Sequence, residues 1–455
     1  MSLPLHIFRD YDIRGIVNLD LTTEVVELIG RAIGSEVLSQ DLTSVLVARD
    51  GRLHSWSIEY SLAQGIAASG CNVYLIGDVP TPMLYFGTTS TGIRSGVMIT
   101  GSHNPSNYNG FKIVVGGNVV SGVDLLDRIQ QGDLSVGHGC IFTKGNIATD
   151  YLNSVQEDIK ICRPIKIVAD AGNGITGKFI VRLLSSIGCE VVPLFCDVDG
   201  TFPNHHPDPS KIENLTDLTA AVLTHGADLG VSFDGDGDRL GAVTNSGVVI
   251  PADRLMMLFS KNILASETKL QNIVYDVKCT RLLKEVIESA GGNPIMSKTG
   301  HSHIKKAIRK TAAIFAGELS GHLFFSDRWF GFDDGLYAAA RLVELVSNSN
   351  VTLDELISQL PLPMETIELT VDVSDSEKFQ FIAKLADQAT REFPNNSSTL
   401  DGIRLEFENS WGVLRASNTT PCLVGRFEGV TLQDLSDVKA TFNHLLNVAK
   451  LHVTL

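Results

Sequence analysis

The chain has 455 residues, of which 44% are hydrophobic and 20% are charged, a composition typical of a soluble globular protein. Its formal net charge of −15 disfavours nonspecific binding to nucleic acid or anionic membranes, so an anionic substrate would need a local cluster of basic residues. No apolar stretch approaches the roughly 18 residues of a membrane helix, and the N-terminal segment has no export signal. The seven cysteines form no C-x-x-C pair. We therefore expect a cytoplasmic protein of about three or four domains.

Three segments share one pattern: an apolar strand, an Asp, a polar loop, an amphipathic helix, a Gly and a second strand. They span residues 45–77, 166–195 and 272–298, and their aligned aspartates are Asp50, Asp170 and Asp276. Alternating strands and helices predict parallel or mixed sheets with helices on both faces. We therefore expect a repeated α/β domain.

The first polar loop whose residues could take part in catalysis is TGSHNPSNYNGFK, residues 100–112. The apolar run before it, 96–99, predicts a short buried strand, and the turn formers at 104–107 cannot continue that strand. Ser102 and His103 therefore lie on a sharp loop at a strand end, where α/β sheets gather catalytic groups. The alternative is an ordinary turn, because Ser, Asn and Pro are common turn residues.

The segment DAGNGITG, residues 170–177, matches the G-x-G-x-x-G pattern of dinucleotide-binding loops. The equivalent loops of the other two repeats lack these glycines. The acidic residue expected about 20 positions on has only approximate counterparts, Glu190 and Asp197. A nicotinamide cofactor is therefore a weak alternative.

The clearest motif is LGVSFDGDGDRLGAV, residues 229–243, in which Asp234, Asp236 and Asp238 alternate with glycines between two apolar strands. Three neighbouring carboxylates repel one another unless a cation lies among them, and oxygen ligands suit Mg²⁺ or Ca²⁺. The EF-hand pattern fails, because its Gly and Glu positions hold Arg239 and Asn245 and the flanking elements are strands. A solvated acidic turn is the remaining alternative to a metal site.

A second polar kink between apolar runs lies in IFAGELSGHLFF, residues 314–325. Glu318 and Ser320 could hydrogen-bond adjacent sugar hydroxyls, and His322 follows them. The alternative is a strand–turn–strand unit with incidental polar residues.

The pattern changes after residue 362. We expect an α+β unit with strands near 366–373, 401–408, 411–415 and 422–428, and helices near 376–391 and from 432. Between two of these strands lie Arg415, Ser417, Asn418 and Thr419, whose guanidinium, hydroxyls and loop N–H groups could bind a phosphate. The alternative is an ordinary hairpin turn. Linkers are expected near residues 150, 250 and 362.

These four loops, in this order, resemble the α-D-phosphohexomutase superfamily, and the resemblance runs from YDIRG at 11–15 to the last strand pair. It implies three related mixed α/β domains plus a C-terminal α+β domain around a central cleft. The implied domains are a phosphoserine domain (1–150), a metal-binding domain (151–250), a sugar-recognition domain (251–362) and a C-terminal phosphate-binding domain (363–455).

The resemblance also implies residue roles. Ser102 would carry the phosphoryl group and bind one Mg²⁺ per chain together with Asp234, Asp236 and Asp238. The general acid/base would be Lys112, favoured by its family position, or His103, with Arg14 assisting. The remaining substrate-binding residues would be Tyr11, Arg239, Lys278, His301, Glu318, Ser320, His322, Arg415, Ser417, Asn418 and Thr419. The basic members, with Arg426, would form the local anion trap that an acidic chain needs.

The family's reaction moves a phosphoryl group between O1 and O6 of a hexose through an enzyme phosphoserine and a hexose 1,6-bisphosphate, with glucose 1,6-bisphosphate as activator. GELSGH resembles the bacterial phosphomannomutase/phosphoglucomutase branch, whereas phosphoglucosamine mutases usually carry Gln where Leu319 stands. The ASNTTP loop favours the same branch. We therefore expect a monomer that acts on mannose and glucose phosphates, with no nucleic-acid or membrane partner. The alternatives are a phosphoglucosamine mutase and a noncatalytic, metal-dependent sugar-phosphate binding protein.

Overall fold

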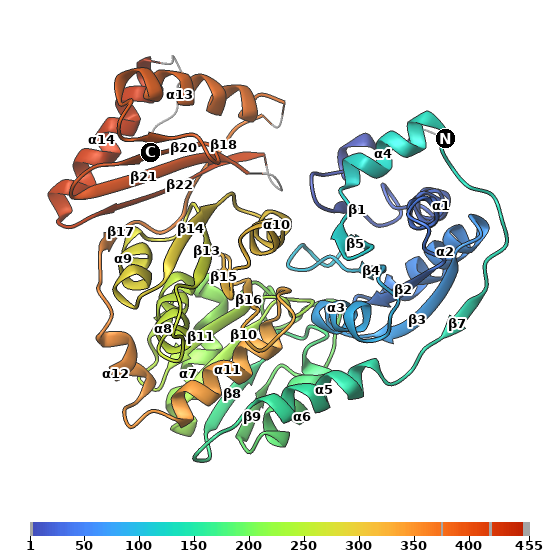
Figure 1. Ribbon diagram of the computed structural model, residues 1–455, viewed down its shortest axis with the longest axis horizontal. Coiled ribbons are helices and arrows are strands. Elements are labelled where there is room, and N and C mark those ends of the chain that lie inside the picture. The colour runs from blue at the N-terminus through green and yellow to red at the C-terminus, as the bar shows by residue number, and fades with distance from the viewer. Residues whose placement is uncertain (1–2, 375, 418–420, 449–455) are drawn as a thin grey trace. The chain divides into compact units, whose positions relative to one another are not determined.

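The computed structural model describes residues 3–374, 376–417 and 421–448 (Figure 1). The chain divides into two compact units. The first unit contains the described residues up to Ala252 together with Ser320–Ile357, and the second contains Asp253–Leu319 and the described residues from Ser358 onward.

The first unit begins with a seven-stranded sheet in the order β1-β5-β4-β2-β3-β7, with β6 paired to β5. Its strands are β1 (Ile13–Ile16), β2 (Ser44–Arg49), β3 (Asn72–Asp78), β4 (Gly96–Ile99), β5 (Tyr108–Val115), β6 (Asn118–Val119) and β7 (Ile141–Thr143). Its helices are the 3₁₀ turn η1 (Leu5–Ile7), α1 (Thr23–Ser39), α2 (Ser55–Ala68), α3 (Thr81–Ser90) and α4 (Gly122–Gln131).

Side chains of β2 alternate between two helical layers, as the two-residue period of a strand requires. Val45 and Val47 belong to one buried cluster with Ile33 of α1 and Ile66 of α2. Leu46 points the other way, because its Cδ1 lies 3.0 Å from where a Cβ on Gly87 of α3 would stand. The sheet is therefore covered on both faces, which explains its continuous apolar strands.

The second sheet of the first unit has the order β12-β11-β10-β8-β9. Its strands are β8 (Lys166–Asp170), β9 (Glu190–Leu194), β10 (Leu229–Phe233), β11 (Leu240–Thr244) and β12 (Val249–Ile250). The unit also contains α5 (Ile147–Asp158), α6 (Gly177–Ser186), η2 (Ile212–Leu215), α7 (Thr216–His225), β16 (Leu323–Phe325), α11 (Gly335–Ser347) and α12 (Leu353–Ser358). The last residue of α12, Ser358, is already assigned to the second unit.

The second unit has two sheets. The first contains β13 (Asn272–Asp276) between β14 (Asn293–Ser297) and β15 (Phe315–Gly317), with helices α8 (Ala252–Leu264), α9 (Arg281–Ser289) and α10 (His301–Thr311). The C-terminal sheet contains β17 (Met364–Glu365), β18 (Leu369–Asp372), β19 (Ser397–Ser398), β20 (Ile403–Glu406), β21 (Ser410–Ala416) and β22 (Cys422–Gly429). Helices α13 (Lys378–Glu392) and α14 (Leu432–Val448) lie on one side of β20, β21 and β22 (Figure 1). The predicted α+β pattern after residue 362 is confirmed.

The predicted repeat is also confirmed. In each copy the two strands of the motif pair in parallel, β2 with β3, β8 with β9 and β13 with β14. The glycine before each second strand has positive φ: +101° at Gly70, +101° at Gly188 and +84° at Gly291. Glycine tolerates this left-handed conformation, which ends each helix and returns the chain to its sheet.

The repeat explains where the polar loops lie. A third strand pairs in parallel with the first strand of each motif: β4 with β2, β10 with β8 and β15 with β13. The Ser102 loop follows β4, the triple-aspartate loop follows β10, and the Glu318 loop follows β15. The three predicted functional loops therefore occupy equivalent positions, each beyond the carboxyl end of a central strand.

The linker expected near residue 150 falls beside α5. Residue 150 lies inside this helix, whose Tyr151 and Leu152 are buried. Across the part of the chain that the structure describes, no helix is long and apolar enough to cross a membrane. All seven cysteines are free thiols.

Candidate active site

Ser102 lies on the loop after β4, and its backbone is in the left-handed region with φ +48°. Its N–H donates to Oγ1 of Thr100 at 2.8 Å. Its hydroxyl donates to Oδ2 of Asp234 at 2.7 Å and lies 3.0 Å from Nδ1 of His103. The loop therefore brings the Ser102 hydroxyl directly to the triple-aspartate loop of the neighbouring sheet.

Asp234, Asp236 and Asp238 are fully buried, and one ligand atom from each lies within 4.8 Å of the others. The N–H groups of Asp238 and Arg239 donate to Oδ1 of Asp234 at 3.1 and 3.2 Å, and Gly237 permits this tight turn with φ +76°. Oδ1 of Asp236 is buried and has no hydrogen-bond partner among the described residues. Oδ1 of Asp238 is also buried without such a partner. Three buried carboxylates with two unsatisfied oxygens fit a hard divalent cation.

Lys112 reaches this cluster from the middle of β5. Its Nζ lies 2.7 Å from Oδ2 of Asp236 and also donates to Oδ2 of Asp238. Burial opposes the charged ammonium, but Asp236 and Asp238 outweigh it and raise the pKa of Lys112. Burial raises the pKa of Asp234, and the negative charges of Asp238 and Asp236 raise it further. Lys112, Arg14 and Arg239 offset part of this negative charge, and the mutual repulsion of the three carboxylates favours a bound cation.

Arg14 and His103 both contact residues of the Ser102 loop. Arg14, from β1, donates through Nε to Asp12 at 2.9 Å and through a terminal nitrogen to the carbonyl of Thr100. Burial lowers the pKa of His103 well below its usual range, and the positive charge of Arg239 lowers it further, so the ring is neutral near pH 7. Tyr11 is half-buried in the bend before β1.

Arg239, Ser320 and His322 form a polar chain beside Asp238. The Arg239 Nε donates to Nε2 of His322 at 3.3 Å, and the same ring nitrogen lies 3.4 Å from Oδ1 of Asp238. Ser320 Oγ lies 2.8 Å from Nδ1 of His322. The structure thus brings Ser102, His103, Lys112, Arg239, Ser320 and His322 together around the three aspartates.

The other predicted residues lie in the second unit. Glu318 is buried after β15, and its Oε1 accepts the N–H of Gly300, immediately before His301 at the start of α10. Lys278 follows β13 and donates to Oε2 of Glu368 at 2.7 Å. Burial opposes its charge, but Glu368 and Asp276 raise the pKa of Lys278.

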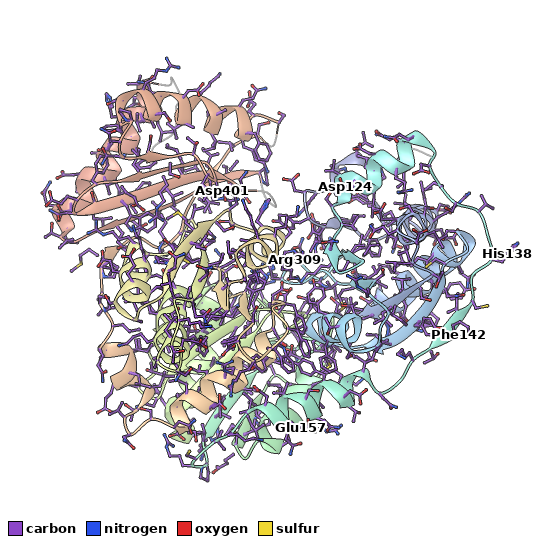
Figure 2. All side chains as sticks on the ribbon, in the orientation of Figure 1. Asp124, His138, Phe142, Glu157, Arg309 and Asp401 are labelled. Atoms are coloured by element: carbon purple, nitrogen blue, oxygen red, sulfur yellow. The ribbon has the colours of Figure 1, made fainter. Side chains whose placement is uncertain are left out.

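Arg415 ends β21, and its Nε donates to Oδ2 of Asp401 at 2.9 Å. The same carboxylate oxygen accepts the N–H of Thr299 at 3.0 Å. Asp401, labelled in Figure 2, therefore links Arg415 to the loop that carries His301. Ser417 is buried and donates its N–H to the carbonyl of Cys422 at 2.9 Å. Asn418 and Thr419 lie outside the described residues.

Arg426 has a different environment from the anion trap expected from sequence. Its guanidinium donates to Oδ2 of Asp253 at 2.7 Å, to Glu365 and to the carbonyl of Lys278 at 2.7 Å. Because these groups already surround it, Arg426 holds the Lys278 segment against the C-terminal sheet. Its sequence position alone did not distinguish a binding arginine from a buried structural one.

This arrangement predicts the effect of Arg426→Met on stability. The substitution leaves Asp253 buried without its cation, so the free energy of unfolding should fall by about 3–5 kcal/mol. Denaturant unfolding followed by circular dichroism measures this change. The control is Arg163→Met, because Arg163 is 42% exposed in its pair with Asp228, and that loss should stay below about 1 kcal/mol. Equal losses in both variants would contradict the structural role of Arg426.

The glycine fingerprint at 170–177 has a packing explanation. A Cβ on Gly174 would lie 3.0 Å from the carbonyl oxygen of Gly235, and a Cβ on Gly177 would lie 2.1 Å from that of Cys196. The Ile175 N–H donates to the Gly235 carbonyl at 3.2 Å. Gly174 therefore lets the loop pack closely against the triple-aspartate loop, and Gly177 lets the start of α6 pack against the segment after β9. The sequence pattern needs no dinucleotide to explain it.

Three residues of the site were missed by sequence reasoning. Thr81, the first residue of α3, donates to Oδ2 of Asp236 at 2.5 Å. Arg52 donates to carbonyls of the Ser102 loop, and Asp401 contacts Arg415 as described above. Arg52 follows the aligned aspartate of the first repeat, Asp50, by two residues, and this position was the available signal. Thr81 and Asp401 have no local pattern that marks them.

Four family models match the chain in order. They are described as phosphoglucomutase/phosphomannomutase alpha/beta/alpha domains I, II and III, at residues 5–132, 149–247 and 251–363, and the C-terminal domain, at 368–445. A phosphomannomutase/phosphoglucomutase of Pseudomonas aeruginosa is 48% identical over 98% of this chain and 96% of its own length. A phosphoglucomutase of Neisseria meningitidis is 45% identical over 98% of this chain and 97% of its own.

A solved structure from Burkholderia thailandensis, a phosphoglucomutase/phosphomannomutase family protein, has the same fold. It superposes with a TM-score of 0.93 at 42% identity, covering 100% of this chain and 99% of the other.

Proposed function

This chain belongs to the phosphoglucomutase/phosphomannomutase family, and we propose that it interconverts hexose 1-phosphates and hexose 6-phosphates of mannose and glucose. The observation that carries the proposal is the 2.7 Å hydrogen bond from the Ser102 hydroxyl to Asp234. It brings a potential phosphoryl acceptor to a buried carboxylate cluster of the kind that binds a divalent cation.

In the proposed reaction, phosphorylated Ser102 gives its phosphoryl group to the free O6 or O1 hydroxyl of a hexose monophosphate. The P–O bond to Ser102 breaks and a P–O bond to the sugar forms, while the general acid/base takes the proton of the sugar hydroxyl and a proton is returned to the Ser102 oxygen. The resulting 1,6-bisphosphate turns around and returns its other phosphoryl group to Ser102. Because such transfer depends on positioning and charge stabilisation, the rigid loop around Ser102 suits it.

We assign Mg²⁺ to the carboxylate cluster, one ion per chain, with Asp234, Asp236, Asp238 and the Ser102 phosphoryl group as ligands. When bound, the ion would neutralise charge on the phosphoryl oxygens. Free glucose 1,6-bisphosphate would act as activator by phosphorylating Ser102.

Lys112 and His103 remain the two candidates for proton transfer, with Arg14 assisting. Lys112 is the protonated member, because Asp236 and Asp238 raise its pKa, so it suits the step in which an oxygen receives a proton. His103 lies 3.0 Å from Ser102 Oγ, within reach of the Ser102 proton.

We propose that the remaining predicted residues bind substrate. Glu318 and Ser320 would contact sugar hydroxyls, and Arg415 and Ser417 would hold the nonreacting phosphate. The other members of this set are Tyr11, Arg239, Lys278, His301, His322, Asn418 and Thr419. The same proposal includes the division at residues 1–150, 151–250, 251–362 and 363–455, a cytoplasmic monomer, and no nucleic-acid or membrane partner.

The choice of sugar follows from the Glu318 loop. O3 and O4 are shared by mannose and glucose, so a loop that contacts only these oxygens tolerates either configuration at C2. The second candidate is glucosamine phosphate, for which Leu319 stands where relatives with that specificity usually carry Gln.

The test is a turnover panel with Mg²⁺ and catalytic glucose 1,6-bisphosphate, using mannose 1-phosphate, glucose 1-phosphate and glucosamine 1-phosphate. We expect comparable turnover of the first two and little of the third. Dominant turnover of glucosamine 1-phosphate would replace the proposed specificity. No turnover of any sugar would contradict the proposed activity and favour a binding protein.

A further inference from the structure

Arg52 is buried in the loop between β2 and α2, and both of its terminal nitrogens contact the Ser102 loop. One terminal nitrogen donates to the carbonyls of Ser102 and Asn104 at 2.8 and 2.7 Å. The other donates to those of Pro105 and Tyr108 at 2.6 and 3.1 Å. A single guanidinium therefore satisfies four carbonyl oxygens of one loop.

Arg52 is also contacted by Asp50 and Phe202. Its Nε lies 3.2 Å from Oδ2 of Asp50, and the same oxygen accepts the Gly101 N–H at 3.2 Å. The ring of Phe202 lies against the guanidinium, with 5.0 Å between the guanidinium carbon and the ring centroid. The Arg52 side chain has no exposed area. The guanidinium is therefore enclosed by protein groups.

The conformation of Ser102 explains why such a clamp is needed. A residue other than glycine keeps a positive φ only where its surroundings hold it, and Ser102 has φ +48°. Its own N–H is bound within the loop, but the carbonyls on its C-terminal side point to Arg52. Without the guanidinium, the buried carbonyl of Ser102 would lose its donor and the half-buried carbonyls of Asn104 and Tyr108 would lose theirs, so the loop would rearrange.

We propose that Arg52 is a positioning residue, which fixes the Ser102 loop so that the Ser102 Oγ stays directed at the carboxylate cluster of Asp234, Asp236 and Asp238. The claim that this affects phosphoryl transfer rests on the proposed function. Lysine cannot replace Arg52, because a compact ammonium cannot reach four carbonyls in one plane. Small misplacements of a reacting atom reduce transfer strongly, by about 100-fold for an error near 1 Å.

The first test compares Arg52→Lys and Arg52→Met with the wild-type enzyme. We expect kcat to fall about 100-fold while KM stays within about threefold, because Arg52 positions the loop and does not hold substrate. The control is Arg31→Lys, since Arg31 donates to the carbonyl of Ser135, outside this loop, and should leave both constants unchanged. A raised KM with an unchanged kcat, or a wild-type kcat in Arg52→Met, would overturn the proposal.

A second variant guards against failure to fold. Gly101→Ala keeps Arg52 but puts a Cβ 2.4 Å from its Cζ and Nε, which forces the guanidinium to move. It should show the same loss of kcat, and full activity would overturn the proposal.

Hydrogen–deuterium exchange gives a readout that does not depend on activity. Amides of residues 100–108 should exchange faster in Arg52→Met and Gly101→Ala than in the wild type, with other regions unchanged. Wild-type protein without turnover would contradict the proposed function alone, whereas unchanged exchange in both variants would contradict the clamp alone.

Discussion

Ser102→Ala is expected to lower mutase turnover by about 10⁴-fold or more, because no other atom can carry the phosphoryl group between the two halves of the reaction. The substitution removes one oxygen and keeps the buried volume nearly unchanged, so the loop clamped by Arg52 should stay in place. Binding of glucose 6-phosphate, measured by calorimetry, should persist. Turnover is measured with mannose 1-phosphate and glucose 1-phosphate under activation by glucose 1,6-bisphosphate.

The matched control is Ser106→Ala. Ser106 is an exposed serine of the same loop, and only its backbone carbonyl has a described contact, with His54 at 3.1 Å. Its replacement should leave turnover within about twofold of wild type, as expected for an exposed polar side chain. Retained turnover in Ser102→Ala would show that the phosphoryl group travels on another residue.

The second large effect is expected for Asp236→Asn. Its carboxylate supplies one of the three charges of the cluster, and its Oδ1 is a buried oxygen with no hydrogen-bond partner among the described residues. Replacing it removes a ligand charge, so the Mg²⁺ concentration for half-maximal activity should rise about 100-fold or more, with a matching loss of activity at low Mg²⁺. The folded state should tolerate the change, because repulsion among the carboxylates decreases and Lys112 keeps Asp238.

Magnesium titrations of activity measure this effect, and thermal shifts with and without Mg²⁺ measure binding independently. Asp217→Asn serves as control, because Asp217 is an exposed carboxylate in the first turn of α7. It should require the same Mg²⁺ concentration as the wild type. An unchanged Mg²⁺ requirement in Asp236→Asn would contradict the assignment of the metal to this cluster.

Sequence patterns predicted the features of this molecule that depend on neighbouring residues. The strand–Asp–helix–Gly–strand repeat follows from apolar periodicity and from glycines such as Gly70 and Gly188, which the structure shows in left-handed turns. The triple-aspartate loop was recognisable because carboxylates at two-residue spacing repel one another unless a cation lies among them. Residue patterns that are local in the sequence therefore predicted the polar loops and their positions at the ends of strands.

Features that depend on distant partners could not be predicted in this way. Arg426 and Arg415 lie on adjacent strands of one sheet, yet one is enclosed by Asp253 and the Lys278 carbonyl while the other is held by Asp401. Arg52 contacts the Ser102 loop only in the folded protein, because α2, β3, α3 and β4 separate the two in the sequence. No period in the sequence encodes these side-chain partners, because tertiary packing selects them.

The most direct test of the account is to locate the phosphoryl group. The protein is incubated with Mg²⁺ and glucose 1,6-bisphosphate, digested, and the peptide containing residues 100–112 is sequenced by mass spectrometry. The account predicts one phosphoryl group on Ser102, which disappears when excess mannose 1-phosphate accepts it. Phosphate on any other residue, or active enzyme that never carries phosphate on Ser102, would contradict the account.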